Sequence, residues 1–505
     1  MTAPRVGAAP PQQSAVDHER YPRATFPDRV ALGHEETLEV VIDAVRSPLA
    51  AISLTIRAEP GETEVPVLVV VQPGTFEVVG ETACEIPVPV DAKPSIPARF
   101  TLVAREEGNQ EIRVKFYPRG AYAAQLAVRT RVVRTTQQAK AATSKTVRTL
   151  SKLPDSPPSA DLTMVILEKS RNRGIFYDVG IWSQKLNIAW DSIGQITFPS
   201  DPDEQFRIFY SELEQINIAA PEAEERIKAA AQNLYKAIVP ERLRSRYWDL
   251  RDSIASIQVV SSEPWIPWEI LMPWDPDNPS APNGQFLCER HVFARWLDGL
   301  EFPRKDRLQT VKVVAPPGAK LPGAQKELRW IRNFGRQKGF SVTEAVEFNE
   351  LLTSFRTEQF DVLHFSTHGR FDPKYPTASG LFLQGGVELR PDNLTGPAAA
   401  FGKANPLVIL NACQTGNLGF SFTRVGGWAT SFLEAGASAF IGTQWSVNDE
   451  TAAEFTQAVY GALNRGDSLG KAVQGARLAA RHKGDPSWLA YQLYAYPNAV
   501  SQLGH

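Results

Sequence analysis

The sequence predicts a multidomain chain in which an all-β sandwich precedes a larger α/β region. From residue 35 to residue 135, apolar and polar residues alternate with a period of two, which is typical of strands with one buried face. After residue 160, short apolar runs alternate with segments of helical spacing, which predicts a parallel sheet covered by helices on both faces. A chain of 505 residues has room for about two to four domains, each with its own core.

The all-β region, residues 35–135, is expected to form a sandwich of two antiparallel sheets. Residues 38–42 and 112–116 place apolar side chains at every second position, and Pro-Gly pairs at 60–61 and 73–74 mark turns between such runs. Each predicted strand therefore has one apolar face, as the packing of two sheets requires. Cys84 lies within this region and is interpreted as a core residue.

Two segments around the sandwich are expected to lack regular structure. Residues 1–34 are rich in Pro, Gln and Ala and lack the apolar core of a signal peptide, so they predict a flexible arm. Residues 136–159 are rich in Thr, Ser and Lys and end in prolines, which predicts a basic linker. Between Glu111 and Asp155 there is no acidic residue. This basic block is either a solvated strand face with a linker, which is favoured, or a docking surface for an acidic partner or nucleic acid.

Composition excludes several classes of protein. The chain has 54 Lys and Arg against 56 Asp and Glu, a net charge of −2, so no global basic field for nucleic acid exists. No apolar run approaches the roughly 20 residues of a membrane span. Its 3 cysteines are too few for a disulfide framework or a four-thiolate zinc site. We therefore expect a cytoplasmic protein that contacts no membrane and holds neither a metal nor a cofactor.

Two predicted strands of the α/β region run directly into residues that carry chemistry. The strand at 361–365 is followed by His368 and Gly369, and the strand at 406–410 is followed by Cys413. Functional groups collect beyond the carboxyl ends of the strands in an open parallel sheet. An imidazole beside a thiol takes its proton during nucleophilic attack, and a glycine lets backbone N–H groups approach a developing oxyanion.

His364 lies four residues before His368 and faces the same side of its strand. A hydrogen-bonded core histidine is favoured over a second catalytic base. No third ligand is evident near the two histidines, so a metal site is disfavoured.

Four motifs resemble those of the CHAT domain, a caspase-like and separase-like cysteine protease family. They are His-Phe-Ser-Thr-His-Gly at 364–369, Leu-Asn-Ala-Cys-Gln-Thr-Gly at 410–416, Trp-Ile-Pro-Trp-Glu-Ile-Leu at 265–271 and a Gly-to-Asp segment at 436–449. The histidine precedes the cysteine by about 45 residues, near the roughly 50 of caspases. The resemblance covers about residues 160–500 and leaves the sandwich outside.

The resemblance implies a pseudo-protease subdomain at 160–305 and a catalytic caspase-like subdomain at 306–505. It also implies that Cys413 is the nucleophile and His368 the general base and acid, and that the N–H groups of Gly369 and Cys413 form the oxyanion hole. The substrate would be a protein, and no cofactor would be needed.

Substrate selection has several candidate residues. Asn411 stands where metacaspases have an aspartate that binds a basic residue before the scissile bond. Trp445 either walls a substrate pocket or packs in the core. Asp449, Glu450 and Glu454 resemble the acidic position with which separases recognise arginine, whereas the alternative, which is favoured, is stabilisation of a helix N-terminus.

The leading hypothesis is a cysteine endopeptidase, which the family's setting places as an effector in prokaryotic defence or programmed death. The sandwich would then bind a regulatory partner protein. Two alternatives stay open: a catalytically silent scaffold with the same fold, and a regulator that responds to nucleic acid through the basic linker. If the basic block is a docking surface, direct contact with nucleic acid is less favoured than contact with an acidic partner.

Overall fold

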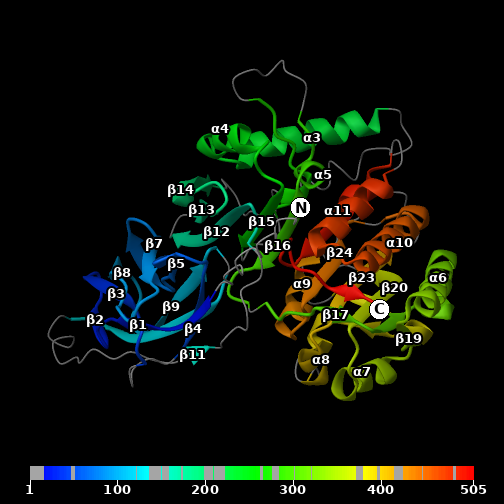
Figure 1. Cartoon of the computed structure of the whole chain (residues 1–505), viewed down its shortest axis with the longest axis horizontal. Coiled ribbons are helices and arrows are strands. Elements are labelled where there is room, and N and C mark those ends of the chain that lie inside the picture. The colour runs from blue at the N-terminus through cyan, green and yellow to red at the C-terminus, as the bar shows by residue number, and fades with distance from the viewer. Residues whose placement is uncertain are drawn as a thin grey trace, which may run out of the picture. The chain divides into compact units, whose positions relative to one another are not determined.

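The structure is a computed structural model of the whole chain, and it forms two compact units, Met1–Ser156 and Pro157–His505 (Figure 1). Each is described by itself. The described residues are 16–46, 52–120, 122–135, 149–150, 159–171, 174–197, 209, 222–261, 266–275, 284–300, 302–319, 321–370, 379–394, 399–413, 425–445, 447–481 and 485–504.

The first unit is a sandwich of two sheets, as predicted. One sheet has the order β4-β1-β3-β8-β6, with the bounds Leu54–Ala58, Val16–Thr25, Glu35–Asp43, Ala98–Ala104 and Phe76–Val79. The other has the order β11-β10-β9-β5-β7, with the bounds Thr149–Leu150, Ala124–Val133, Gly108–Pro118, Glu64–Gln72 and Ala83–Pro89. The short strand β2 (Arg29–Ala31) adds to β10 in parallel. Alternate residues of both sheets share one core, which includes Leu38, Val40, Ile42, Val67, Val69, Ile112, Val114 and Phe116.

The strands begin at Val16, so the expectation of a flexible arm over residues 1–34 is corrected for its second half. The inward positions of β1 are filled by Arg20, Pro22 and Ala24, which leaves no run of large apolar residues to reveal the period of two. Arg20 is 5% exposed, and its guanidinium donates to backbone carbonyl oxygens of residues 89 and 90. A buried cation satisfied by carbonyl groups thus takes the place of an apolar side chain.

Three arginines of the basic block, on β9, on β10 and directly after β10, are paired with acidic residues. The Nε atoms of Arg113 and Arg129 each lie 3.1 Å from a carboxylate oxygen of Glu111, and Nε of Arg134 lies 2.9 Å from a carboxylate oxygen of Glu107. All three guanidinium groups are more than half exposed, so each pair stabilises the fold by less than about 1 kcal/mol. This pairing favours the solvated strand face over a free basic docking surface. The linker expected at 136–159 lies almost wholly outside the described residues.

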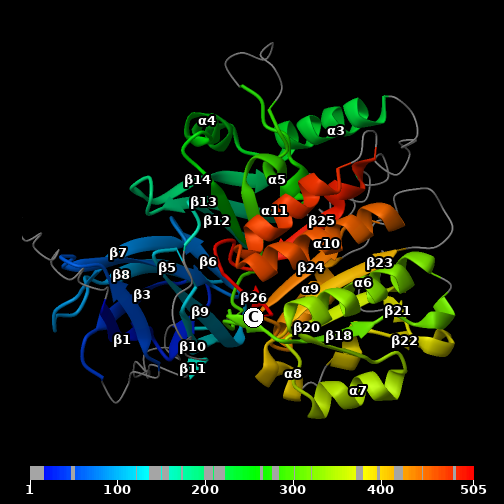
Figure 2. The same ribbon diagram turned by 45° about the vertical axis from the view of Figure 1, so that its right-hand side comes forward.

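A single mixed sheet runs through the second unit (Figure 2). Its order is β14-β13-β12-β15-β16-β25-β24-β23-β20-β18-β19. In that order the bounds are Ile188–Thr197, Gly174–Ser183, Leu162–Arg171, Ser256–Ser261, Val292–Leu297, Tyr491–Tyr494, Ala439–Thr443, Leu407–Cys413, Val362–Arg370, Thr310–Val314 and Ser341–Glu344. The short strands β21 (Gly380–Phe382) and β22 (Glu388–Leu389) extend from β20, and β17 (Arg307–Leu308) pairs separately with β26 (Gln502–Leu503).

Helices cover this sheet on both faces. The longer helices are α3, α4, α6, α7, α9, α10 and α11, with the bounds Ala223–Ile238, Glu241–Leu250, Pro322–Lys338, Phe348–Thr357, Val425–Glu434, Asp449–Arg465 and Leu469–Ala479. Two short helices are α5 (Leu287–Arg290) and α8 (Ala399–Ala404). One apolar core contains side chains of α6, α10 and α11, which contact one another or the sheet. An aromatic cluster of Phe355, Phe401 and Phe432 joins α7, α8 and α9.

The direction of the strands reverses at β25. Strand β16 is parallel to β25 through a single register pair, Arg295 with Tyr494, whereas β25 is antiparallel to β24. The parallel strands β12, β15 and β16 therefore end at one edge of the sheet, and β18, β20, β23 and β24 end at the opposite edge. The boundary expected between residues 305 and 306 does not interrupt this sheet.

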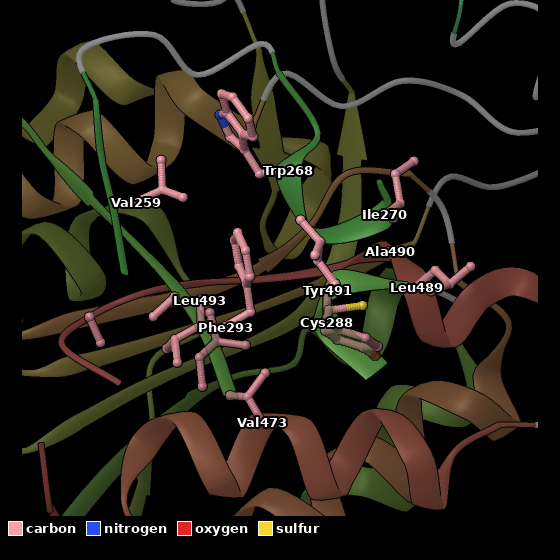
Figure 3. Close-up of a cluster of buried hydrophobic side chains, with 14 of the residues drawn as sticks. Val259, Trp268, Ile270, Cys288, Phe293, Val473, Leu489, Ala490, Tyr491 and Leu493 are labelled. Carbon is pink, nitrogen blue, oxygen red and sulfur yellow. The ribbon is translucent and has the colours of Figure 1, made fainter. Parts of the chain in front are cut away.

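A buried ion pair lies at the seam of the sheet, which is the place beside β25 where the strand direction reverses. Glu269, from the 265–271 motif, is 0% exposed, and its two oxygens accept from Arg295 Nε at 2.7 Å and from the second guanidinium nitrogen at 2.5 Å. Gln492 of β25 lies 3.4 Å from the same carboxylate. Figure 3 shows Trp268 and Ile270 of the motif among the buried side chains of this core. The motif therefore joins the two halves of the sheet.

Candidate active site

The strands predicted to carry the nucleophile and the base are neighbours. Strands β20 and β23 are parallel over seven register pairs, which run from Val362 opposite Leu407 to His368 opposite Cys413. Adjacent strands lie about 4.8 Å apart, so the backbone brings these two positions together at the carboxyl edge. Short apolar runs with both faces covered form the first part of these strands, and the buried polar residues Ser366, Thr367 and Asn411 follow them.

The two positions belong to the face covered by α6 and α10. Successive residues of a strand alternate between faces, so Ser366 shares a face with His368, and Asn411 shares a face with Cys413. The side chains of Ser366 and Asn411 both bond to Glu327 of α6. This identifies the face.

The structure describes the surroundings of His368 more fully than those of Cys413. His368 is partly exposed, and Gly369 is buried and pairs with Leu381 of β21. The side chain of Cys413 lies outside the described residues, as do residues 371–378 and 414–424. The oxyanion hole expected from the N–H groups of Gly369 and Cys413 stays a prediction.

A buried polar network lies directly beneath these strand ends. Glu327 accepts from Ser366 Oγ at 2.5 Å, from Asn411 Nδ2 at 3.1 Å and from the Thr456 hydroxyl of α10. His364 Nε2 lies 3.2 Å from the same carboxylate. The carboxylate, whose side chain is 4% exposed, thereby connects two strands and two helices.

The chemistry of this network favours an ionised carboxylate. Burial by itself raises the pKa of Glu327, but the nearby His364 imidazole and hydrogen bonds from two hydroxyl groups outweigh burial and hold that pKa below its usual value. On its other side, His364 Nδ1 is 3.2 Å from the Tyr460 hydroxyl. His364 is 0% exposed, which agrees with a hydrogen-bonded core histidine.

Sequence reasoning missed Glu327, although one signal marks it. The apolar stripe of this helix contains Ala324, Leu328 and Ile331, and residue 327 falls on that stripe by helical spacing. A charged residue on a buried stripe needs a partner, and that partner was not visible from the sequence.

Comparison with protein families is decisive for the classification. A model of the CHAT domain matches residues 228–496, which is more than half of the chain. The chain belongs to the CHAT domain family. This confirms the resemblance read from the motifs and the expected fold class of an all-β region followed by an α/β CHAT domain.

Solved structures similar to this chain include a gingipain and a separase complex. Arg-specific gingipain R is 12% identical with a TM-score of 0.36, over 59% of this chain and 75% of that chain. A separase–securin complex of Saccharomyces cerevisiae is 10% identical with a TM-score of 0.41, over 68% of this chain and 30% of that chain. A comparison with curated proteins gives no match.

The CHAT domain places two of the specificity candidates inside the fold. Asn411 is 3% exposed, and its amide group accepts from the Tyr491 hydroxyl at 3.2 Å in addition to donating to Glu327. Trp445 is also 3% exposed and belongs to the core cluster. Both side chains therefore pack within the fold instead of lining open surface.

The acidic candidates lie at the start of α10, on the edge where β24 ends. Asp449 and Glu450 are exposed in the first turn, and Asn448 caps the helix by accepting from the Thr451 N–H at 2.8 Å. Glu454, one turn later, is half-buried. The carboxylates of Asp449 and Glu450, in the first turn, stabilise the helix dipole. The three acidic residues lie at the same edge of the sheet as His368, because β24 is parallel to β23 and β20.

Other expectations can be compared with the described part of the chain. There, no group of three or more His, Cys, Asp or Glu side chains is arranged to hold a metal ion. No described helix is both long and apolar enough to cross a membrane. Cys84 is half-buried against the sandwich core. Cys288 is fully buried, and burial raises the pKa of its thiol to about 12.

Proposed function

We propose that the chain is a cysteine endopeptidase in which Cys413 is the nucleophile and His368 is the general base and acid. The observation that carries this proposal is the register of β20 and β23, which sets the two residues opposite each other at the carboxyl edge of a CHAT domain. A thiol and a neighbouring imidazole are the minimum set for acyl transfer to sulfur.

The proposed reaction has two steps. His368 takes the thiol proton as the sulfur of Cys413 attacks the peptide carbonyl carbon, and the N–H groups of Gly369 and Cys413 hold the resulting oxyanion. His368 then gives the proton to the leaving amine, which breaks the peptide bond and leaves a thioester. Water, deprotonated by His368, hydrolyses the thioester and restores the thiol.

The substrate is proposed to be a partner protein, with the chain acting as an effector in prokaryotic defence or programmed death. The sandwich has a core of its own and forms a separate compact unit, which suits a module that binds a regulatory partner. Asp449, Glu450 and Glu454 are proposed to attract a basic residue before the scissile bond, because they lie at the same sheet edge as the dyad.

The test compares new protein N-termini in cells that hold the unmodified chain, the Cys413→Ala variant or the Cys84→Ala variant. Cys84 is a matched control because it lies in the other unit. New termini that need Cys413 and not Cys84 support the proposal, and the residue before each cut reports the preference. Identical termini with and without Cys413 would refute the proposal and favour a catalytically silent chain.

A further inference from the structure

We propose that Glu327 is a positioning residue for the Cys413–His368 dyad, because it ties the strand of the base to the strand of the nucleophile just before both strands end. This inference rests on the proposed function. It adds a residue that lies on neither strand and outside all four motifs.

The tie consists of the hydrogen bonds that the Glu327 carboxylate accepts from one residue of each strand, and these two residues form a single register pair. Ser366 lies opposite Asn411, and both side chains bond to the carboxylate, Ser366 Oγ at 2.5 Å and Asn411 Nδ2 at 3.1 Å. Residues two apart on a strand share a face and are separated by about 6.6 Å. His368 and Cys413 are therefore the next pair on this face, and any shift between the strands at the tie reaches the dyad.

The carboxylate that makes the tie is itself held firmly. It also accepts from the Thr456 hydroxyl of α10, and its side chain is 4% exposed. A buried charge persists only where several donors surround it. An amide in place of the carboxylate keeps only one of the two oxygens that accept from Ser366 and Asn411, so one group would no longer accept from both strand ends.

A second polar network, which joins helix α7 to the sheet, supplies a matched control. Ser354 of α7 donates to Glu358 at 2.9 Å and accepts from Lys312 of β18 at 3.1 Å. Like Ser366, Ser354 is a buried serine whose hydroxyl donates to a carboxylate. It lies on the face of the sheet covered by α7, away from the tie.

The experiment measures how fast iodoacetamide alkylates Cys413 relative to Cys84 in the folded, full-length chain at pH 6.5, by mass spectrometry of the two peptides. Cys84 is an internal reference because it lies in the first unit. Glu327→Gln is expected to slow Cys413 by about tenfold to a hundredfold, the effect of a misplacement near 1 Å. Ser366→Ala is expected to slow it less, and Ser354→Ala is expected to leave the ratio unchanged.

The outcomes separate this inference from the proposed function. If His368→Ala does not slow Cys413, the proposed dyad is wrong. If His368→Ala slows Cys413 but Glu327→Gln and Ser366→Ala do not, only the positioning role is overturned, even where these variants lower the free energy of unfolding. Should Glu327→Gln fail to fold, Ser366→Ala decides, because it removes a single hydroxyl group from the tie.

Discussion

The ion pair at the seam of the sheet leads to a quantitative prediction for the Glu269→Gln substitution. Glutamine keeps the shape of the side chain but removes its charge, which leaves the Arg295 guanidinium buried with its side chain 4% exposed. Of the two hydrogen bonds, at 2.7 Å and 2.5 Å, glutamine retains one acceptor. Arg295 also keeps its bond to the Ile266 carbonyl oxygen.

The expected loss follows from these contacts. A hydrogen bond to a charged group contributes about 1.5–3 kcal/mol, and breaking a buried ion pair from one side costs about 3–5 kcal/mol. Because one neutral hydrogen bond survives, Glu269→Gln is expected to lower the free energy of unfolding by about 3 kcal/mol. The double variant Glu269→Gln with Arg295→Met removes the uncompensated cation and is expected to lose less than Glu269→Gln alone.

Urea denaturation followed by tryptophan fluorescence measures this loss in the second unit alone. All 11 tryptophans follow residue 181, so none reports on the sandwich. Trp296, next to Arg295, is buried and senses the seam directly. A loss below about 1 kcal/mol for Glu269→Gln, the range of an exposed pair, would refute the buried ion pair, as would a double variant less stable than the single one.

Two further predictions concern the same unit. Burial lowers the pKa of His291 to about 4 from its ordinary value of 6.5, so the unfolded chain binds a proton that the folded chain does not as the pH falls through this window. Stability is expected to drop by about 3 kcal/mol between pH 7 and pH 4 from this group, and urea denaturation of His291→Phe should show a shallower pH dependence. In helix α11, a Cβ on Gly470 would lie 2.2 Å from Val292 and one on Gly475 would meet nothing within 4 Å. Gly470→Ala is expected to cost about 1–3 kcal/mol and Gly475→Ala to stabilise by up to about 1 kcal/mol, and equal effects would contradict the close packing.

The strands that the sequence revealed share one property: their inward positions hold large apolar residues. The runs at 38–42 and 112–116 became β3 and β9, whereas β1 stayed hidden because Arg20 and Pro22 point inward. Period-two patterning detects burial of apolar groups, and it fails where a buried cation is satisfied by carbonyl oxygens.

The candidate site divides in the same way. The register of His368 and Cys413 follows from two neighbouring strands ending at one edge, which motif spacing and the rule for parallel sheets anticipate. The role of Asn411 did not follow, because its partners Glu327 and Tyr491 come from segments far away in the sequence. Such long-range polar contacts depend on how helices pack, and no local pattern encodes them.

The reversal at β25 limits what the first half of the sheet contributes to the proposed site. Since β12, β15 and β16 end at the edge opposite to β20 and β23, the segments that follow them begin away from His368. The 265–271 motif follows β15, and its Glu269 reaches the second half through β16 and β25. Because these contacts fix β25 beside β24, substitutions in the motif are expected to change stability before substrate preference.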